Sequence, residues 1–180
     1  MSTTTYIPDP VTLGTGLLLA RLILGVLMVG HGTQKLFGWF GGYGIAGTAG
    51  FFEQLGFRPG RLFVITASLS EVASGILIAL GLFGPVGPAL LLSVMIVAAI
   101  SVHWKNGLFA GTNGIEVPLL YAAGALALAF TGYGPFALDA AMGIDHAWTP
   151  ELKLAALAVG VVGGVVNLLA RRPAHVAATA

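Results

Sequence analysis

The sequence predicts an all-α membrane protein with an antiparallel four-helix transmembrane core, a fifth C-terminal transmembrane helix and a short interfacial helix after the first span. Of its 180 residues, 57% are hydrophobic and only 8% are charged, and the mean hydropathy is +0.93. Soluble domains contain roughly 45–50% apolar and about 25% charged residues. A water-soluble fold could not hide so much apolar surface behind so few polar residues, so the composition predicts an integral membrane protein.

Five apolar runs account for the predicted spans, because about 17–25 apolar residues are needed to cross a hydrocarbon core of roughly 30 Å. The runs cover residues 12–37, 62–83, 87–104, 115–132 and 151–170. The tight joint "GLFGPVGP" predicts that the second and third runs form an antiparallel hairpin. Between the first two runs, "GIAGTAGFFEQLGF" predicts the interfacial helix, because its aromatic side chains suit a membrane surface.

The chain therefore divides into four parts. We expect an N-terminal segment over 1–11, a four-helix membrane domain over 12–142, a loop and fifth helix over 143–172, and a disordered tail over 173–180. No basic region and no cleavage site precede the first apolar run, which predicts that this run is retained as a helix rather than removed as a signal peptide.

The basic side chains predict the orientation in the membrane. Arg21 lies inside the first span and is not counted. If the N-terminus lies outside, Lys153 also lies outside, and the other six basic residues lie on the cytoplasmic side. This asymmetry satisfies the positive-inside rule and places the C-terminus in the cytoplasm. The six cytoplasmic residues are Lys35, Arg58, Arg61, Lys105, Arg171 and Arg172.

The composition also excludes several functions. A net charge of +1, with no basic run beyond Arg171–Arg172, argues against a nucleic-acid partner. The chain has no cysteine, which removes disulfides, Fe–S clusters and thiolate zinc sites. No nucleotide-binding loop and no Ser–His–Asp spacing stands out. A redox role would therefore take its electrons from a cofactor or a partner.

Two charges lie deep inside predicted spans. Arg21 is nine residues into the first span and Glu71 is nine residues into the second, which places each of them about 13–14 Å from opposite surfaces. Both therefore lie near the middle of a core about 30 Å thick. An isolated charge at that depth costs several kcal/mol, whereas an Arg–carboxylate pair satisfies both groups. We predict that Arg21 and Glu71 pair, either to fix helix register or as part of a functional pocket.

A second polar cluster is predicted where the spans reach the cytoplasmic surface. His31 and Lys35 end the first span, His103 ends the third and Glu116 opens the fourth. Histidines and carboxylates can bind metals, and two histidines can ligate haem, but neither HxxxH nor HExxH spacing is present. We therefore predict no metal site, with His31, His103 and Glu116 as weak candidates, and the alternative is ordinary interfacial polar residues. The ligand-binding or proton-relay candidates are Arg21, His31, Lys35, Glu71, His103 and Glu116.

Several stretches carry a family resemblance: "RLILGVLMVGHGTQKLFGWFGG", "GTAGFFEQLGF", "SEVASGILIALGLFG", "AAISVHWKNGLF" and "GIEVPLLYAAGALALAFTGYGPFALDA". Together they resemble the DoxX family of small bacterial membrane proteins, over about residues 14–142. The resemblance implies a compact four-helix core in the bacterial inner membrane, with the fifth span as an addition. The family is named for its likeness to a subunit of an archaeal thiosulfate:quinone oxidoreductase, and some members are linked to redox complexes with soluble partners.

The leading hypothesis is a redox-associated subunit that binds quinone, or a similar lipid ligand, at the polar cluster. Arg21 and Lys35 would donate to headgroup carbonyls, His31 and His103 would exchange protons, and the two glutamates would orient them. Enzymatic turnover by the chain alone is neither predicted nor excluded, and a soluble redox protein is the expected partner. The missing cysteines argue against direct sulfur chemistry.

Two alternatives remain open. One is a non-enzymatic membrane scaffold that recruits a partner through the surface around Phe51–Arg61. The other is a small transporter, which would need an inverted repeat or broken helices that the sequence does not offer. The glycine-lined face of the first span is compatible with an internal bundle or with a homo-oligomer.

Overall fold

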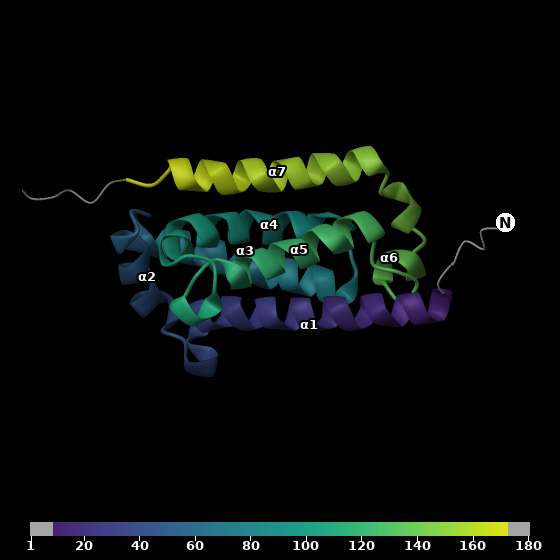
Figure 1. Ribbon diagram of the computed structural model, residues 1–180, viewed down its shortest axis with the longest axis horizontal. Coiled ribbons are helices and arrows are strands. Elements are labelled where there is room, and N and C mark those ends of the chain that lie inside the picture. The colour runs from purple at the N-terminus through teal and green to yellow at the C-terminus, as the bar shows by residue number, and fades with distance from the viewer. Residues whose placement is uncertain (1–8, 173–180) are drawn as a thin grey trace, which may run out of the picture.

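The computed structural model describes residues 9–172 as a bundle of helices (Figure 1). Four of its elements are long and apolar enough to cross a membrane, which confirms the predicted fold class. Most of the predicted segment 1–11 and all of the predicted tail 173–180 lie outside the described residues. The four elements are α1 (Pro10–Phe37), α3 (Gly60–Leu80), α4 with the turns that continue it (Val86–Asn106), and α7 (Pro150–Leu169).

The predicted fourth span forms a shorter helix than the others. This helix, α5, covers Glu116–Thr131 and has 16 residues. At 1.5 Å per residue it is about 24 Å long, less than a hydrocarbon core of about 30 Å. The C-terminal helix α7 has 20 residues and therefore has the full length of a span.

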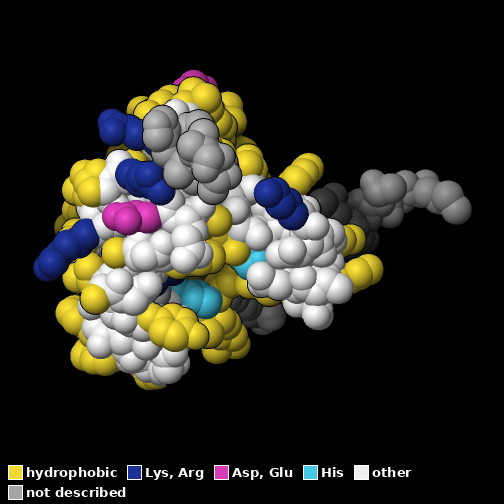
Figure 2. All heavy atoms as spheres, turned by 90° about the vertical axis from the view of Figure 1, so that its left-hand side faces the viewer, with side chains coloured by type: hydrophobic (Ala, Val, Ile, Leu, Met, Phe, Trp, Pro, Cys, Tyr) yellow, Lys and Arg dark blue, Asp and Glu magenta, His cyan; other side chains and the backbone are white. Residues whose placement is uncertain are grey.

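Two short helices lie at opposite ends of the bundle (Figure 1). The predicted interfacial helix is present as α2 (Gly44–Gln54), and α6 (Leu138–Ala141) lies beside the start of α1. We call these two regions the α2 end and the α6 end. Six basic and three acidic side chains lie in the α2 half of the bundle, against two basic and four acidic in the α6 half. Figure 2 shows the α2 end with its lysine and arginine side chains.

Glycines set the register between α1 and α3. A Cβ atom on Gly25 would lie 2.5 Å from the carbonyl oxygen of Gly75, and one on Gly75 would lie equally close to the carbonyl oxygen of Gly25. A Cβ on Gly32 would lie 2.5 Å from Val72. The two backbones therefore approach so closely that only glycine fits. This face of α1 is used inside one chain, so it is not free to form a homodimer.

The hairpin predicted from "GLFGPVGP" is confirmed. Helix α3 ends at Leu80, the next residue, Gly81, adopts the left-handed conformation that favours glycine at this position, and α4 begins at Val86. At its other end α4 continues into a π-helical turn over Ala99–His103. Such turns hold one extra residue and are frequent at functional sites.

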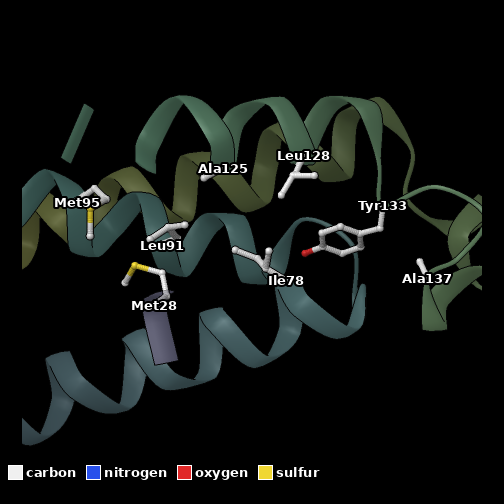
Figure 3. Packing of buried hydrophobic residues seen from close by; sticks show 8 residues of the cluster. All are labelled: Met28, Ile78, Leu91, Met95, Ala125, Leu128, Tyr133 and Ala137. Carbon is white, nitrogen blue, oxygen red and sulfur yellow. The ribbon is translucent and has the colours of Figure 1, made fainter. Parts of the chain in front are cut away.

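The apolar core lies between the two ends (Figure 3). Its members come from α1, α3, α4, α5 and the segment after α5, and all are at least nine-tenths buried. No charged side chain belongs to this cluster of described residues, so it separates the polar groups of the α2 end from those of the α6 end. The cluster consists of Met28, Ile78, Leu91, Met95, Ala125, Leu128, Tyr133 and Ala137.

Candidate functional site

The predicted pair between Arg21 and Glu71 is wrong. The ammonium group of Lys35 lies 2.7 Å from each carboxylate oxygen of Glu71. Arg21 instead donates hydrogen bonds to the main-chain carbonyls of Ala79 and Phe136. Each deep charge has partners, as the cost of burying it requires, but the two belong to different groups of residues.

The direction of the side chains explains this difference. In an α-helix each side chain leans toward the N-terminus of its own helix. Because α1 and α3 are antiparallel, Arg21 leans toward the α6 end and Glu71 leans toward the α2 end. Lys35, farther along α1, leans back toward Glu71. The prediction from sequence compared only how deep the Cα atoms of Arg21 and Glu71 lie in the membrane. It did not include the opposite directions in which their side chains lean.

At the α6 end, Arg21 and Asp139 hold the turn between α3 and α4. Arg21 donates to Ala79 in the last turn of α3, where carbonyl groups lack helical partners and the helix dipole favours a cation. The Asp139 carboxylate accepts the main-chain N–H groups of Phe83 at 2.8 Å and Gly84 at 2.6 Å, and the indole N–H of Trp148 at 2.9 Å. We call Arg21, Asp139 and Trp148 the hairpin clamp.

The charged groups of the α6 end are engaged with the hairpin turn, while two buried side-chain atoms, Nε of Arg21 and the hydroxyl oxygen of Tyr133, have no hydrogen-bond partner among the described residues. Arg21 and Asp139 are each only 2% exposed. A hollow of about 390 Å³ adjoins Asp139, and Lys153 lines it. The Lys153 ammonium group donates to the main-chain carbonyl of Phe130 at 3.2 Å. Burial raises the pKa of the Tyr133 phenol, so this side chain stays neutral. The charged groups here serve the fold.

At the α2 end, a cavity of about 320 Å³ opens among the helices. Figure 2 shows histidine side chains in the hollow, surrounded by hydrophobic side chains. Largely apolar walls with a few convergent polar groups are typical of small-molecule sites. We call it the α2-end cavity, and its polar lining residues are His31, Lys35, Thr66, Ser70, Glu71, Ser93, Ser101, His103, Tyr121 and Asn167.

The ion pair of Lys35 and Glu71 lies in the wall of the cavity. The Glu71 side chain is 5% exposed and the Lys35 side chain is 26% exposed. Lys35 also lies 3.4 Å from the main-chain carbonyl of His31. The two charges cancel, so the cavity presents a strong local dipole but no net charge from this pair.

The two predicted histidines both line the cavity, with Tyr121 beside one of them. The Nδ1 atom of His103 lies 2.8 Å from the carbonyl oxygen of Asn113. Because a carbonyl can only accept, Nδ1 donates, and in the neutral imidazole Nε2 is left as an acceptor. The ring of His31 packs edge-on against Tyr121, with ring centres 5.9 Å apart. The cavity therefore combines a histidine acceptor with a phenol donor.

Glu116 does not line the cavity. Its carboxylate accepts the main-chain N–H of Ala110 at 2.7 Å and so holds the loop that precedes α5. The structure thus gathers His31, Lys35, Glu71 and His103, while Arg21 and Glu116 lie elsewhere.

Sequence reasoning missed two polar side chains of the cavity, Tyr121 and Asn167. Each carries a signal that was available in the sequence. Tyr121 is the only tyrosine within a predicted span, and Asn167 is the only amide side chain in the fifth span. A polar group at such a position needs a polar neighbour inside the bundle.

The weak metal candidates are not brought together. His31 and His103 share the α2-end cavity, but Glu116 is engaged in its loop. Across residues 9–172 no group of three or more histidines and carboxylates is placed to hold a metal ion.

Fold and cavity together define a multi-pass membrane helix bundle with an internal, ligand-sized cavity at one end. The family model for DoxX matches residues 16–104, from the first turns of α1 to the end of the π-helical turn. The chain belongs to the DoxX family, as the sequence resemblance predicted. The matched region contains His31, Lys35, Glu71 and His103, and it ends before α5 and α7. Neither the curated proteins nor the solved structures contain a match to this chain.

Proposed function

We propose that the protein binds a quinone, or a lipid with a similarly neutral oxygenated headgroup, in the α2-end cavity as the membrane subunit of a redox system. The observation that carries this proposal is the cavity itself, in which His103 and Tyr121 lie within largely apolar walls. Quinone carbonyls accept hydrogen bonds, which the Tyr121 hydroxyl can donate. Quinol hydroxyls donate hydrogen bonds, which Nε2 of His103 can accept.

The charge of the cavity favours a neutral headgroup. Because Lys35 and Glu71 neutralise one another at 2.7 Å, no free cation is left in the wall to hold a phosphate or carboxylate. An anionic phospholipid headgroup would lose its hydration without gaining a counter-charge. A quinone ring loses far less hydration, and its apolar tail fits the aromatic side chains of the cavity mouth, Phe51 and Phe52.

Electrons would come from another protein. Reduction of a quinone to a quinol takes up two electrons and two protons, and this chain has no cysteine pair that could supply them. In this proposal a soluble redox protein delivers the electrons. His103 and His31 lie where protons could pass to or from the ligand.

The charge distribution supports a bacterial inner-membrane protein with the α2 end in the cytoplasm. Six of the eight lysine and arginine residues lie in that half of the bundle. The absence of cysteine allows a direct test with single cysteines introduced at Arg58 and at Asp145. In whole cells, a membrane-impermeant maleimide should label the Asp145→Cys variant and should not label the Arg58→Cys variant. The reverse pattern would overturn this orientation.

The scaffold alternative has less support. Its contact surface, Phe51–Arg61, includes Phe57, which is only 2% exposed. The main-chain N–H of Arg172 donates to the carbonyl of Gly56 at 2.8 Å, so the C-terminal segment already occupies part of this surface.

The test is to extract the detergent-purified protein with organic solvent and to quantify quinones and lipids by mass spectrometry. Wild-type protein should retain quinone near one molecule per chain, whereas His103→Ala and Tyr121→Phe should retain several-fold less. His146→Ala is the matched control, because that histidine is 81% exposed and lies near the α6 end. Equal retention by all four proteins, or none by any, would contradict the proposal and favour the scaffold.

A further inference from the structure

After its first turn, helix α7 is apolar except at one position on its inner face. From Leu154 to Ala170 the only polar side chain is Asn167. The residues of α7 that are buried, Leu157, Gly160 and Gly164, follow one another at three- and four-residue spacing. Asn167 continues this spacing by one step. It therefore lies on the stripe that faces the bundle rather than the face turned outward.

Glycines bring this stripe close to α4. A Cβ atom on Gly160 would collide with the main chain of Ala89, and one on Gly164 would lie 3.0 Å from the carbonyl oxygen of Ser93. These contacts show that α4 and α7 run parallel. One turn farther along, Asn167 is level with the last turns of α4, just before the π-helical turn that carries His103. Asn167 and His103 accordingly line the same cavity.

The end of α7 is fastened to the segment that follows α2. Arg172 donates its main-chain N–H to Gly56, and Nε of Arg171 donates to the carbonyl of Leu55 at 2.9 Å. The Arg171 guanidinium also lies 5.6 Å from the ring centre of Phe57. Because Leu55 and Phe57 line the cavity, this fastening fixes α7 as one of its walls.

The hydrogen bonding of Asn167 leaves one donor and one acceptor free. Its side-chain NH₂ donates one hydrogen to the carbonyl of Gly163 at 2.9 Å, which fixes the amide against its own helix. The second N–H and the amide oxygen have no partner among the hydrogen bonds of the described residues. Nearby, the Ser93 hydroxyl also has none. This wall therefore offers its own polar groups, separate from those of His103 and Tyr121.

We propose that α7, which lies outside the matched family region, is part of the ligand site, and that Asn167 determines which headgroup the cavity accepts. The inference rests on the function proposed above and assigns the selection of the oxygenated headgroup to one residue. Asn167 would donate its second N–H to a ring oxygen of a quinone, and its amide oxygen would accept from the hydroxyl of a quinol. A headgroup without polar ring atoms would form no hydrogen bond with Asn167.

Two probes separate recognition from simple packing. Decylubiquinone carries an oxygenated ring and decylbenzene carries a bare ring on the same tail, so only the first can hydrogen-bond to Asn167. Their affinities are measured by equilibrium binding in detergent micelles for wild type, Asn167→Leu, Asn167→Ala and Asn167→Gln. Val166→Ala is the control, because Val166 lies on the same turn and is 56% exposed on the outer face. Thermal unfolding establishes that each variant is folded.

We expect Asn167→Leu and Asn167→Ala to bind decylubiquinone about tenfold more weakly, as loss of one hydrogen bond predicts, with little change for decylbenzene. Asn167→Gln should recover part of the loss, and Val166→Ala should match wild type. If the Asn167→Leu and Asn167→Ala variants lose the same affinity for both probes, selection by Asn167 is overturned. If they lose affinity for neither probe, a role for α7 in binding is overturned. In both cases quinone binding by wild type would leave the proposed function intact. Wild-type protein that binds neither probe would overturn both proposals.

Discussion

The two ends of the bundle each bury a carboxylate and a cation, yet they use them differently. At the α6 end, Asp139 accepts three N–H groups and Arg21 donates to main-chain carbonyls, so both charges hold the hairpin turn. At the α2 end, Glu71 and Lys35 bind one another beside an open cavity. Burial alone therefore does not mark a functional charge. What distinguishes the two ends is what the charged groups bind: main-chain groups around a turn at the α6 end, and one another in the wall of a cavity at the α2 end.

The apolar core keeps the two ends separate. Met28, Ile78 and Leu91 are fully buried in this core, between the two ends (Figure 3). This separation gives no support to the transporter interpretation. It also means that a substitution at one end should leave the other end's property unchanged.

The largest effect on stability is expected at the hairpin clamp. Asp139→Ala removes the acceptor of three N–H groups and should lower the free energy of unfolding by about 3 kcal/mol. Denaturation in mixed detergent measures this loss. Quinone retained per folded molecule should not change. A clear fall in that ratio would show that the two ends are coupled.

A smaller loss is expected when the ion pair is broken. Lys35→Met leaves the Glu71 carboxylate without its counter-charge and should cost about 2 kcal/mol, less than a fully buried pair because Lys35 is partly exposed. Lys35→Met combined with Glu71→Leu should recover most of this stability, because neither charge then remains. Both variants should lose quinone retention. If the double variant retains quinone as wild type does, the pair is architectural, like the hairpin clamp.

A kinetic effect is expected at the contact between α7 and α2. Arg171→Ala removes the hydrogen bond to Leu55 and the contact with Phe57, for about 1 kcal/mol of stability. Release of bound quinone, followed by transfer to empty vesicles, should become several-fold faster. Arg58→Ala is the matched control, because it removes an equal charge from an exposed site. Faster release in both variants would point to surface charge instead of the contact.

The smallest effect is expected at the first turn of α1. Asp9 accepts the main-chain N–H and the hydroxyl of Thr12, and these hydrogen bonds lower its pKa. Its contribution is therefore present at neutral pH and is lost as the pH falls below about 4. The protection factor of the first turn, which is the intrinsic exchange rate at each pH divided by the observed rate, should fall in acid in wild type and should be equally low at both pH values in Asp9→Ala. A protection factor that is independent of pH in wild type would remove the role of this cap.

The sequence predicted the architecture well because hydropathy and turn residues determine it locally. The hairpin between α3 and α4, the short helix α2 and the full length of α7 all follow from apolar runs and from glycine and proline at their ends. The partners of the charges could not be obtained in this way. Partner choice depends on the close approach of Gly25 to Gly75, and on Arg21 and Glu71 leaning toward opposite ends.

The site was predicted in part for a similar reason. His31, Lys35 and His103 stand out because polar residues at span ends are conspicuous, and the structure gathers them. Tyr121 and Asn167 reach the cavity from helices whose position in the bundle no local pattern specifies. Glu116 was wrongly expected at the site, because the sequence pattern of a carboxylate at the start of a helix does not show whether it binds a ligand or a main-chain N–H of the preceding loop.

The π-helical turn over Ala99–His103 makes the cavity sensitive to the deletion of a single residue. Loss of a single codon within this turn would restore α-helical geometry and rotate His103 by about 100° around the helix axis. The third span would lose one residue and would stay long and apolar enough to cross a membrane, and the hairpin clamp would be untouched. One codon therefore separates a chain that presents this histidine to a ligand from a chain that retains only the bundle.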